Sequence, residues 1–120
     1  MIIGHGIDLQ EISAIEKAYN KNSKFAERIL TTNEFVVFSQ LKNHKRKIEF
    51  LAGRWAGKEA FSKALGTGIG QVGFKDIEIL PNEKGAPYIN QAIFQGNVYI
   101  SLTHSGNFAQ ASVILEENNS

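Results

Sequence analysis

The longest stretch of helix-favouring sequence lies in the middle of the chain, from about Lys45 to Leu65. It contains no proline, and Gly66 stands where a glycine commonly ends a helix. Its apolar residues fall on two sides, one formed by Ile48, Leu51, Ala52 and Trp55 and the other by Phe50, Phe61 and Leu65. Because a helix that is apolar on more than one side is largely enclosed by protein, other elements or neighbouring subunits must surround this one.

The part of the chain before this helix predicts one strand and further helices. A strand is expected over 2–9 and a helix over 11–19, where apolar residues recur at helical spacing. An apolar segment follows over 25–30. Thr31 and Glu34 have the spacing of a capping box, which predicts a helix from about Asn33 to Leu41.

The part after the helix predicts strands. Residues 66–73 are rich in glycine and are expected to form a flexible connection. Beyond them the apolar residues alternate with polar ones, which is typical of strands. Strands are expected over 76–80, 87–89, 98–102 and 109–115, the last two as an antiparallel pair joined through 105–107. A strand, then helices, then several strands favour an α+β fold.

Length and composition exclude several classes of protein. With 120 residues, the chain is expected to form a single domain over 1–120. It has no cysteine, which excludes disulfides, thiolate metal sites and a cysteine nucleophile. The N-terminal residues lack the features of a signal peptide, and no apolar run approaches the roughly 18 residues of a membrane helix. We therefore expect a soluble, cytoplasmic protein with no membrane partner.

Positive charge is concentrated in the long helix and just before it. The chain has a formal net charge of only +1, yet seven basic residues and two acidic ones lie between Lys42 and Lys63. The basic residues are Lys42, Lys45, Arg46, Lys47, Arg54, Lys58 and Lys63. They could form a solvated helix face, or they could contact phosphate groups, which arginine and lysine bind well. A positive segment in a nearly neutral chain indicates a local anion site.

Glu59 and Lys63 are the first candidates for chemistry within this segment. Glu59 lies four residues after Trp55, so on a helix it joins an apolar side, where an ionised carboxylate is costly unless it is paired or bound to a metal. Lys63 follows one turn later on the same side. The plain alternative is a helix ion pair between the two, worth about 0.2–0.5 kcal/mol if exposed.

Asp8, at the end of the first apolar stretch, is the third candidate. It could cap the next helix. It could also join Glu59 as a second oxygen ligand for Mg²⁺, which takes one or two carboxylates together with substrate phosphates and waters. Spacing in the sequence leaves both alternatives open.

The glycine-rich segment and the histidines give weaker signals. Gly66 to Gly70 follow a helix and lack the lysine and hydroxyl of a Walker loop, so they indicate a helix end and not a phosphate loop. His104 lies where a strand meets a turn, a position suited to ligand contact, although a lone histidine can equally be structural. Serines and histidines show no triad pattern, which argues against acyl-enzyme hydrolysis.

Several segments together resemble a known family. They are Gly6-Ile7-Asp8, Phe25 to Thr31 with Glu34, Leu51 to Gly68, Gly85-Ala86-Pro87 and Ser101 to Ser105. In order, spacing and total length they are similar to the holo-acyl-carrier-protein synthases, the small trimeric 4′-phosphopantetheinyl transferases. The resemblance implies the 4′-phosphopantetheinyl transferase fold and a homotrimer with active sites between neighbouring subunits.

The resemblance also implies a reaction and its parts. Phosphopantetheine would pass from coenzyme A to a serine of apo-acyl carrier protein in fatty acid biosynthesis, releasing adenosine 3′,5′-bisphosphate. Asp8 and Glu59 would hold Mg²⁺, Glu59 would act as the base directly or through a metal-bound water, and Lys63 would stabilise or protonate the leaving phosphate. The nucleotide and its phosphates would be lined by Lys45, Arg46, Arg54, Ser62, Lys63, Gly66, Pro87 and His104. Phe25 and Arg28 would meet the acidic carrier protein.

Two positions depart from the pattern of that family. Ala14 stands where many members carry an arginine associated with carrier docking, and Lys17, Lys21 or Lys24 could supply part of that charge. Gly57 replaces a commoner small residue and should cost up to about 1 kcal/mol of helix stability.

A non-catalytic module that binds nucleic acid or another polyanion through 42–63 is the alternative function. It lacks an aromatic stacking platform, and Asp8 and Glu59 would repel phosphate, so no nucleic-acid partner is expected.

Overall fold

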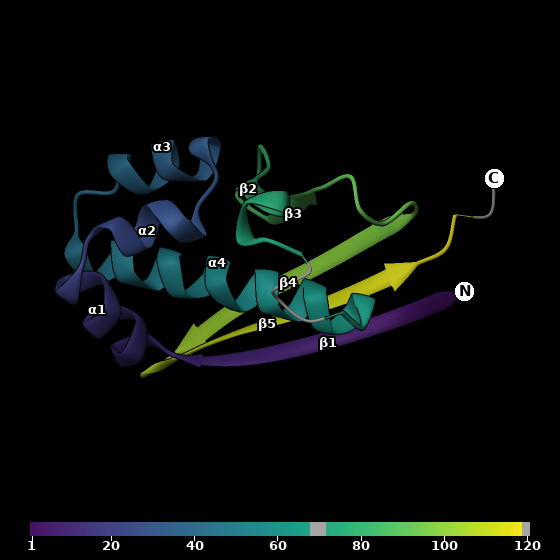
Figure 1. The fold of residues 1–120 in the computed structure, drawn as a ribbon, viewed down its shortest axis with the longest axis horizontal. Helices are drawn as coiled ribbons and strands as arrows, with labels where there is room; N and C mark the ends of the chain where they lie inside the picture. Colours follow the sequence, from purple (N-terminus) through teal and green to yellow (C-terminus); the bar gives the residue numbers. More distant parts are fainter. Residues whose placement is uncertain (68–71, 119–120) are drawn as a thin grey trace.

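An antiparallel sheet and one long helix form the framework of the molecule (Figure 1). The structure, a computed structural model, describes residues 1–67 and 72–118. Its helices and strands are β1 (Ile2–Glu11), α1 (Ile12–Lys21), α2 (Lys24–Ile29), α3 (Thr32–Gln40), α4 (His44–Leu65), a 3₁₀ turn η1 (Phe74–Asp76), β2 (Glu78–Pro81), β3 (Pro87–Asn90), β4 (Asn97–Ser105) and β5 (Phe108–Glu116). The expected α+β order is confirmed. The predicted connection over 66–73 lies partly outside the described residues.

The sheet has the strand order β1-β5-β4, so the last strand lies between the first and the fourth. All three strands pair antiparallel, with Asp8 opposite Ala111 and Leu102 opposite the same alanine from the other side. The predicted pairing of β4 with β5 is confirmed. A separate hairpin of β2 and β3 lies above α4, on the side of the helix away from the sheet (Figure 1).

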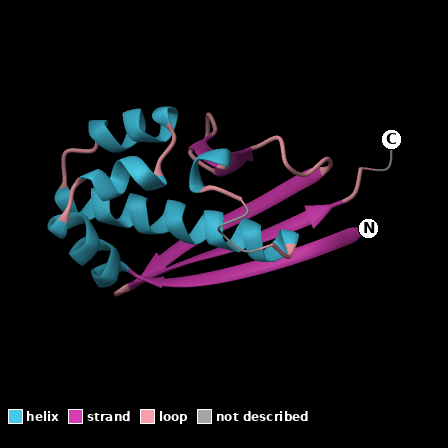
Figure 2. Ribbon diagram, in the orientation of Figure 1, coloured by secondary structure: helices cyan, strands magenta, loops and turns pink. Residues whose placement is uncertain are grey.

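Helix α4 covers one face of this sheet, and the shorter helices gather around its first half (Figure 2). Against it pack Ala109, Ala111, Val113 and Leu115, the alternate residues of β5 that are buried. The first half of α4 contributes Ile48, Leu51 and Ala52 to a second core shared with α1, α2 and α3. The prediction that α4 is enclosed on more than one side is therefore confirmed within a single chain.

The ends of the helices follow the predicted signals. Thr31 caps α3, and its side chain and that of Glu34 form the reciprocal capping box. Asn43 caps α4, with its side-chain oxygen accepting a hydrogen bond from the amide of Arg46 at 3.2 Å. Gly66 ends α4 with φ of +88°, a left-handed conformation that is strained for residues with a β-carbon.

Glycines allow the elements around α4 to approach its backbone. A β-carbon at Gly6 would lie 2.1 Å from the carbonyl oxygen of Ala60, and one at Gly4 would lie 2.2 Å from that of Ala64. On another side of α4, a β-carbon at Gly57 would lie 2.4 Å from a methyl of Ile79. Gly57 thus lets α4 pack closely against β2, which offsets the helix propensity it lacks.

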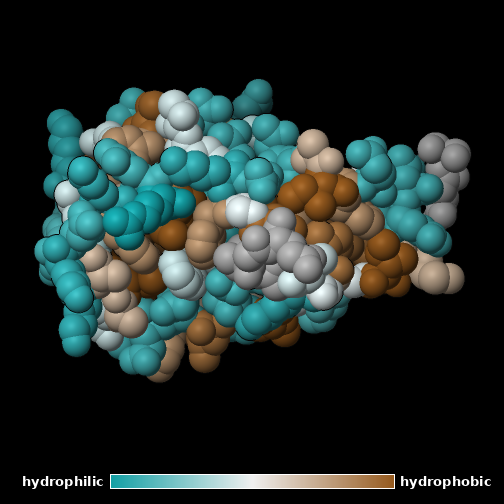
Figure 3. Space-filling view, viewed as in Figure 1, coloured by the Kyte–Doolittle hydropathy of each residue, from teal (hydrophilic) through white to brown (hydrophobic). Residues whose placement is uncertain are grey.

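The opposite face of the sheet is bare in one chain. Its apolar side chains are exposed and include Ile3, Ile7 and Leu9 of β1, Tyr99 of β4 and Phe108 of β5. Figure 3 shows apolar surface gathered toward the end of the molecule that carries both termini. In the described parts of the chain, no helix is long and apolar enough to cross a membrane.

Candidate active site

Asp8, Lys63 and Glu59 come together along the edge of α4 that faces β1. On β1, Gly4, Gly6 and Asp8 stand at alternate positions. These three strand residues therefore share the face of β1 that contacts α4. The ammonium of Lys63 donates hydrogen bonds to Oδ1 of Asp8 at 2.9 Å and to the carbonyl of Ile7 at 3.1 Å. Lys63 is therefore hydrogen-bonded to a residue of β1. It does not form the ion pair with Glu59 that was the plain alternative.

The second carboxylate oxygen of Asp8 is buried, and it has no hydrogen-bond partner within the described residues. Burial raises the pKa of the Glu59 carboxyl, the negative charge of Asp8 raises it further, and Lys63 lowers it in part. The two carboxylates thus repel each other, and the single positive charge of Lys63 offsets that repulsion only in part. Asp8 does not cap α1, whose N-cap residue is Glu11, so that alternative is wrong.

This pair of carboxylates fits a magnesium ion. Mg²⁺ prefers hard oxygen ligands and commonly takes only one or two carboxylates, because substrate phosphates and waters fill its other positions. Residues 1–67 and 72–118 contain no group of three or more metal-binding side chains, as a site built entirely from protein would need. The buried free oxygen of Asp8 beside Glu59 is the observation that favours a cation here.

A pocket of about 370 Å³ opens on the other flank of α4, beside β4. Three of the predicted phosphate ligands line it, namely Arg46 and Arg54 of α4 and His104 of β4. Gly85, in the turn between β2 and β3, also lines it, whereas Pro87 begins β3 just beyond. Residues far apart in the sequence thus form one concave site, whose lining holds two arginines and one acidic residue, Glu49.

Arg54 is the buried cation of this pocket. Its guanidinium lies over the ring of Phe50, 3.9 Å from the centroid, and its Nε donates to the carbonyl of Ile79 at 3.2 Å. Burial lowers the pKa of Arg54 to about 10, although the nearby charge of Glu34 opposes this shift. Arg54 is therefore cationic at neutral pH and held in a fixed orientation.

His104 lies at the mouth of the same pocket. Its Nδ1 is 3.5 Å from a carboxylate oxygen of Glu49, a partly buried residue of α4. Its side chain is exposed, so the ring can meet a ligand from solvent. This arrangement favours the ligand-binding interpretation of His104 over a purely structural one.

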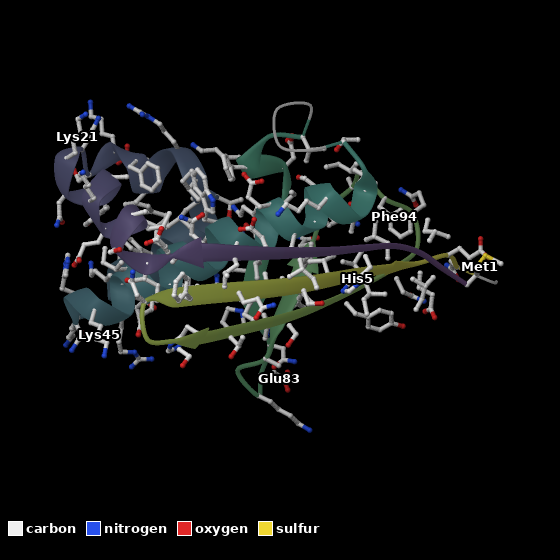
Figure 4. All side chains as sticks on the ribbon, turned by 90° about the horizontal axis from the view of Figure 1, so that it is seen from below. Met1, His5, Lys21, Lys45, Glu83 and Phe94 are labelled. Carbon is white, nitrogen blue, oxygen red and sulfur yellow. The ribbon has the colours of Figure 1, made fainter. Side chains whose placement is uncertain are left out.

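The other predicted site residues lie around these two clusters. Lys45 is exposed in the first turn of α4, at the end of the molecule opposite Met1 (Figure 4). Ser62 is buried and donates to the carbonyl of Lys58 at 3.0 Å, one turn before Gly66. Arg28 is exposed on α2, where the partly buried Phe25 stacks on Trp55.

Lys58 fits neither interpretation of the positive segment, which was expected to form a solvated helix face or to contact phosphate. Lys58 is neither a solvated residue nor available to phosphate, because its side chain is fully buried and pairs with Glu34 at 2.5 Å. The burial of Glu34 was not predicted, since the capping box explained its place in the sequence. Only the contact of α3 with α4 and β2 shows the second role of this carboxylate.

The two clusters lie on opposite flanks of α4. Asp8 and Lys63 lie beside β1 at one edge of the sheet, whereas Arg46 and His104 lie beside β4 at the other edge. Along α4, Arg46 precedes Glu59 by about 20 Å, given the rise of the helix. One chain therefore holds two separate halves of a site, one rich in carboxylate and the other in positive charge.

Known proteins are similar to this chain in sequence and fold. Residues 4–115 match the 4′-phosphopantetheinyl transferase superfamily. The chain is 66% identical over 118 residues, 98% of each protein, to a holo-[acyl-carrier-protein] synthase of Streptococcus thermophilus. It is similar, with a TM-score of 0.90 and 48% identity over 98% of this chain and 99% of the other, to a holo-(acyl-carrier-protein) synthase from Bacillus anthracis in complex with CoA (3′,5′-ADP). A Helicobacter pylori holo-[acyl-carrier-protein] synthase in complex with coenzyme A aligns with a TM-score of 0.82 and 35% identity over 93% and 99% of the two chains.

Proposed function

Because the chain belongs to the holo-[acyl-carrier-protein] synthases of the 4′-phosphopantetheinyl transferase superfamily, we propose that Asp8, Glu59 and Lys63 carry out its reaction. The enzyme transfers 4′-phosphopantetheine from coenzyme A to a serine of apo-acyl carrier protein in fatty acid biosynthesis, and adenosine 3′,5′-bisphosphate leaves. This activity replaces the alternative of a non-catalytic polyanion-binding module. We propose that residues 1–120 act as one transferase domain.

Asp8 and Glu59 are the proposed ligands of Mg²⁺. The observation that carries this proposal is the buried Oδ2 of Asp8, which has no partner in the described structure, together with the nearby Glu59 carboxylate, whose charge Lys63 offsets only in part. When bound, Mg²⁺ would supply positive charge against the charge that grows on the leaving 5′-phosphate of the nucleotide as the bond between the bridging oxygen and the transferred phosphorus breaks. Lys63 holds Oδ1 of Asp8 and leaves Oδ2 for the ion.

Glu59 and Lys63 are the proposed proton-handling groups. The serine oxygen of the carrier forms a bond to the phosphorus of the phosphopantetheine arm, and the bond from that phosphorus to the bridging oxygen breaks. Glu59 accepts the proton of the serine, directly or through a metal-bound water. Lys63 is half-exposed at the same place and can donate a proton or a hydrogen bond to the leaving phosphate.

The pocket beside β4 is the proposed site for the nucleotide. Arg46, Arg54 and His104 line it, and Lys45 is exposed in the same helical turn as Arg46. Arginine binds phosphate through two parallel hydrogen bonds, and the fixed guanidinium of Arg54 suits this role. By family resemblance, Ser62, Gly66 and Pro87 lie near the ligand as well.

A homotrimer with active sites between neighbouring subunits is proposed because each chain holds two separate halves of a site. The 3′-phosphate and the diphosphate of coenzyme A are attached to one ribose, so one molecule cannot span the two flanks of α4 within a chain. A neighbouring copy can place its β4 flank against the β1 flank, and repetition of this contact closes a ring. The bare apolar face of the sheet supplies surface for such an assembly.

Carrier docking is proposed at α1 and α2. Arg28 is exposed there, and Lys17, Lys21 and Lys24 are exposed nearby. Their charges suit an acidic partner even though Ala14 contributes none. Phe25 offers part of an aromatic ring beside Arg28, supported from behind by Trp55.

Incubation of the enzyme with coenzyme A, Mg²⁺ and an apo-acyl carrier protein tests the proposed site. Mass spectrometry should show the carrier gaining the mass of phosphopantetheine. Glu59→Gln should abolish this gain, because the variant keeps the shape of the side chain but loses the base and one metal ligand. Unchanged turnover in this variant would remove Glu59 from the mechanism. Size-exclusion chromatography with light scattering checks that the assembly is intact.

A further inference from the structure

Glu34 is a fully buried carboxylate outside both clusters of the site. Its Oε1 accepts hydrogen bonds from the amide of Thr31 at 2.8 Å and from the ammonium of Lys58 at 2.5 Å. Its Oε2 accepts from the amide of Ile79 at 2.7 Å. One side chain of α3 thus joins its own N-terminus to α4 and to β2.

Ile79 connects Glu34 to the nucleotide pocket, because Ile79 is also hydrogen-bonded to Arg54, which lines that pocket. Among the described residues, strand β2 pairs with β3 alone, so its other edge presents backbone groups that need partners. At Ile79 two charged side chains supply them, because Glu34 accepts from the amide and Arg54 donates to the carbonyl at 3.2 Å. Glu34 and Arg54 are therefore both hydrogen-bonded to the backbone of Ile79, one to its amide and the other to its carbonyl.

Charge links the same residues. Burial lowers the pKa values of both Lys58 and Arg54, and the negative charge of Glu34 raises both. Lys58 is neutralised by a direct hydrogen bond to this carboxylate. Arg54 is held through Ile79 and lines the pocket, so its charge is left for an anionic ligand.

We propose that Glu34 is a positioning residue for coenzyme A, acting through Ile79 and Arg54 without touching the ligand. The proposal rests on the nucleotide site assigned to Arg54 under the proposed function. The hydrogen bond from Ile79 to Glu34 holds β2 in its position next to α4. The carbonyl of Ile79 in turn orients the guanidinium of Arg54, which binds a phosphate of coenzyme A. Loss of the carboxylate would displace Arg54 and weaken binding of the nucleotide, while the reacting groups at Asp8 and Glu59 stay in place.

A cycle of variants separates this role from a purely structural one. E34Q/K58M removes the two buried charges together, so that neither is left unpaired. R54Q removes the phosphate ligand, and E34Q/K58M/R54Q combines the changes. The KM for coenzyme A and kcat are measured for each, with thermal unfolding as a check on the fold. Ile15→Val, a small change at the buried residue of α1, is the control for loss of stability alone.

The expected result is non-additive. R54Q and E34Q/K58M should each raise KM about tenfold with kcat changed far less, because they weaken binding and not the chemical step. The triple variant should raise KM no further than R54Q, since both changes act on one contact. Ile15→Val should leave KM unchanged. Multiplicative effects in the triple variant, or a wild-type KM in E34Q/K58M, would overturn the positioning role.

Two further outcomes are distinguishable. A wild-type KM in R54Q would show that the proposed nucleotide site is wrong, and it would overturn the role of Glu34 with it. If E34Q/K58M does not fold, Glu34→Asp takes its place in the cycle. Aspartate keeps the charge but is too short to reach both Lys58 and Ile79, so KM should again rise while an unchanged KM would refute the proposal.

Discussion

Lys63 binds only one of the two carboxylate oxygens of Asp8. Its ammonium lies 2.9 Å from Oδ1, and Oδ2 is buried without a partner in the described residues. Because an unpaired buried carboxylate oxygen is costly, the arrangement favours a second cation on the side of Glu59. Lys63 orients the aspartate, and the pair of acids remains available for Mg²⁺.

Asp8→Asn should remove most of the activity and weaken Mg²⁺ binding. The amide keeps the size of the side chain but has no negative charge to offer a cation at the position of Oδ2, and it weakens the contact with Lys63. We expect kcat to fall at least about 100-fold, a loss typical of removing a charged group that acts in the transition state. Calorimetric titration with Mg²⁺ in the presence of adenosine 3′,5′-bisphosphate measures the binding directly. Tight Mg²⁺ binding by the variant would contradict the assignment.

The stability of the metal-free enzyme should fall as pH rises above the usual pKa of a glutamate. Burial and Asp8 raise the pKa of Glu59 from 4.5, so the folded state binds a proton that the unfolded state releases. The contribution of Glu59 to stability is therefore fully present below pH 4.5 and is lost as pH rises through its elevated pKa. Thermal unfolding at a series of pH values measures this slope. Glu59→Gln should flatten it, and an unchanged slope in that variant would assign the effect to other groups.

Gly6→Ala should damage both fold and activity. The added β-carbon would lie 2.1 Å from the carbonyl of Ala60, a backbone atom that cannot move aside cheaply. We expect a loss of about 1–3 kcal/mol in the free energy of unfolding, as for other overpacked sites, and a displaced Asp8 two residues later. Gly53→Ala is the matched control for stability, because its β-carbon would find no neighbour closer than 3.9 Å. Chemical denaturation compares the two, and equal stability would contradict the tight contact between β1 and α4.

The sequence predicted elements better than it predicted which side chains meet. Helix α4 could be placed because Gly66 and the absence of proline are local signals, and the strands could be placed because their side chains alternate. The closeness of Asp8 and Glu59 came from a family resemblance, since 51 positions separate them and no local rule brings them together. Lys58 was misjudged for the same reason. Its charge indicates a surface position, and it is buried because its ammonium donates to Glu34 and to the carbonyl of Ile29, which lie on other helices.

Lys58→Met alone should destabilise the enzyme strongly. The methionine fills the space of the lysine stem, but Glu34 then loses the cation that is hydrogen-bonded to it. Breaking one half of a buried ion pair costs about 3–5 kcal/mol, whereas replacing both halves can be nearly neutral. Denaturant unfolding should therefore show Lys58→Met to be less stable than E34Q/K58M. The reverse order would show that the pair itself contributes little.

Mixing Asp8→Asn with Arg54→Gln should restore activity, measured at coenzyme A concentrations well below KM, if the site lies between subunits. Asp8→Asn retains the nucleotide pocket on its β4 flank, and Arg54→Gln retains the carboxylates on its β1 flank. In hybrid trimers formed by refolding the two together, some interfaces join an intact Asp8 to an intact Arg54. Random assembly of equal amounts in a cyclic trimer should place such a site at about one quarter of the interfaces, so about a quarter of the wild-type rate is expected. The two variants refolded separately and then mixed without exchange are the control. If both halves of each site came from the same chain, co-refolding would restore no activity beyond that control.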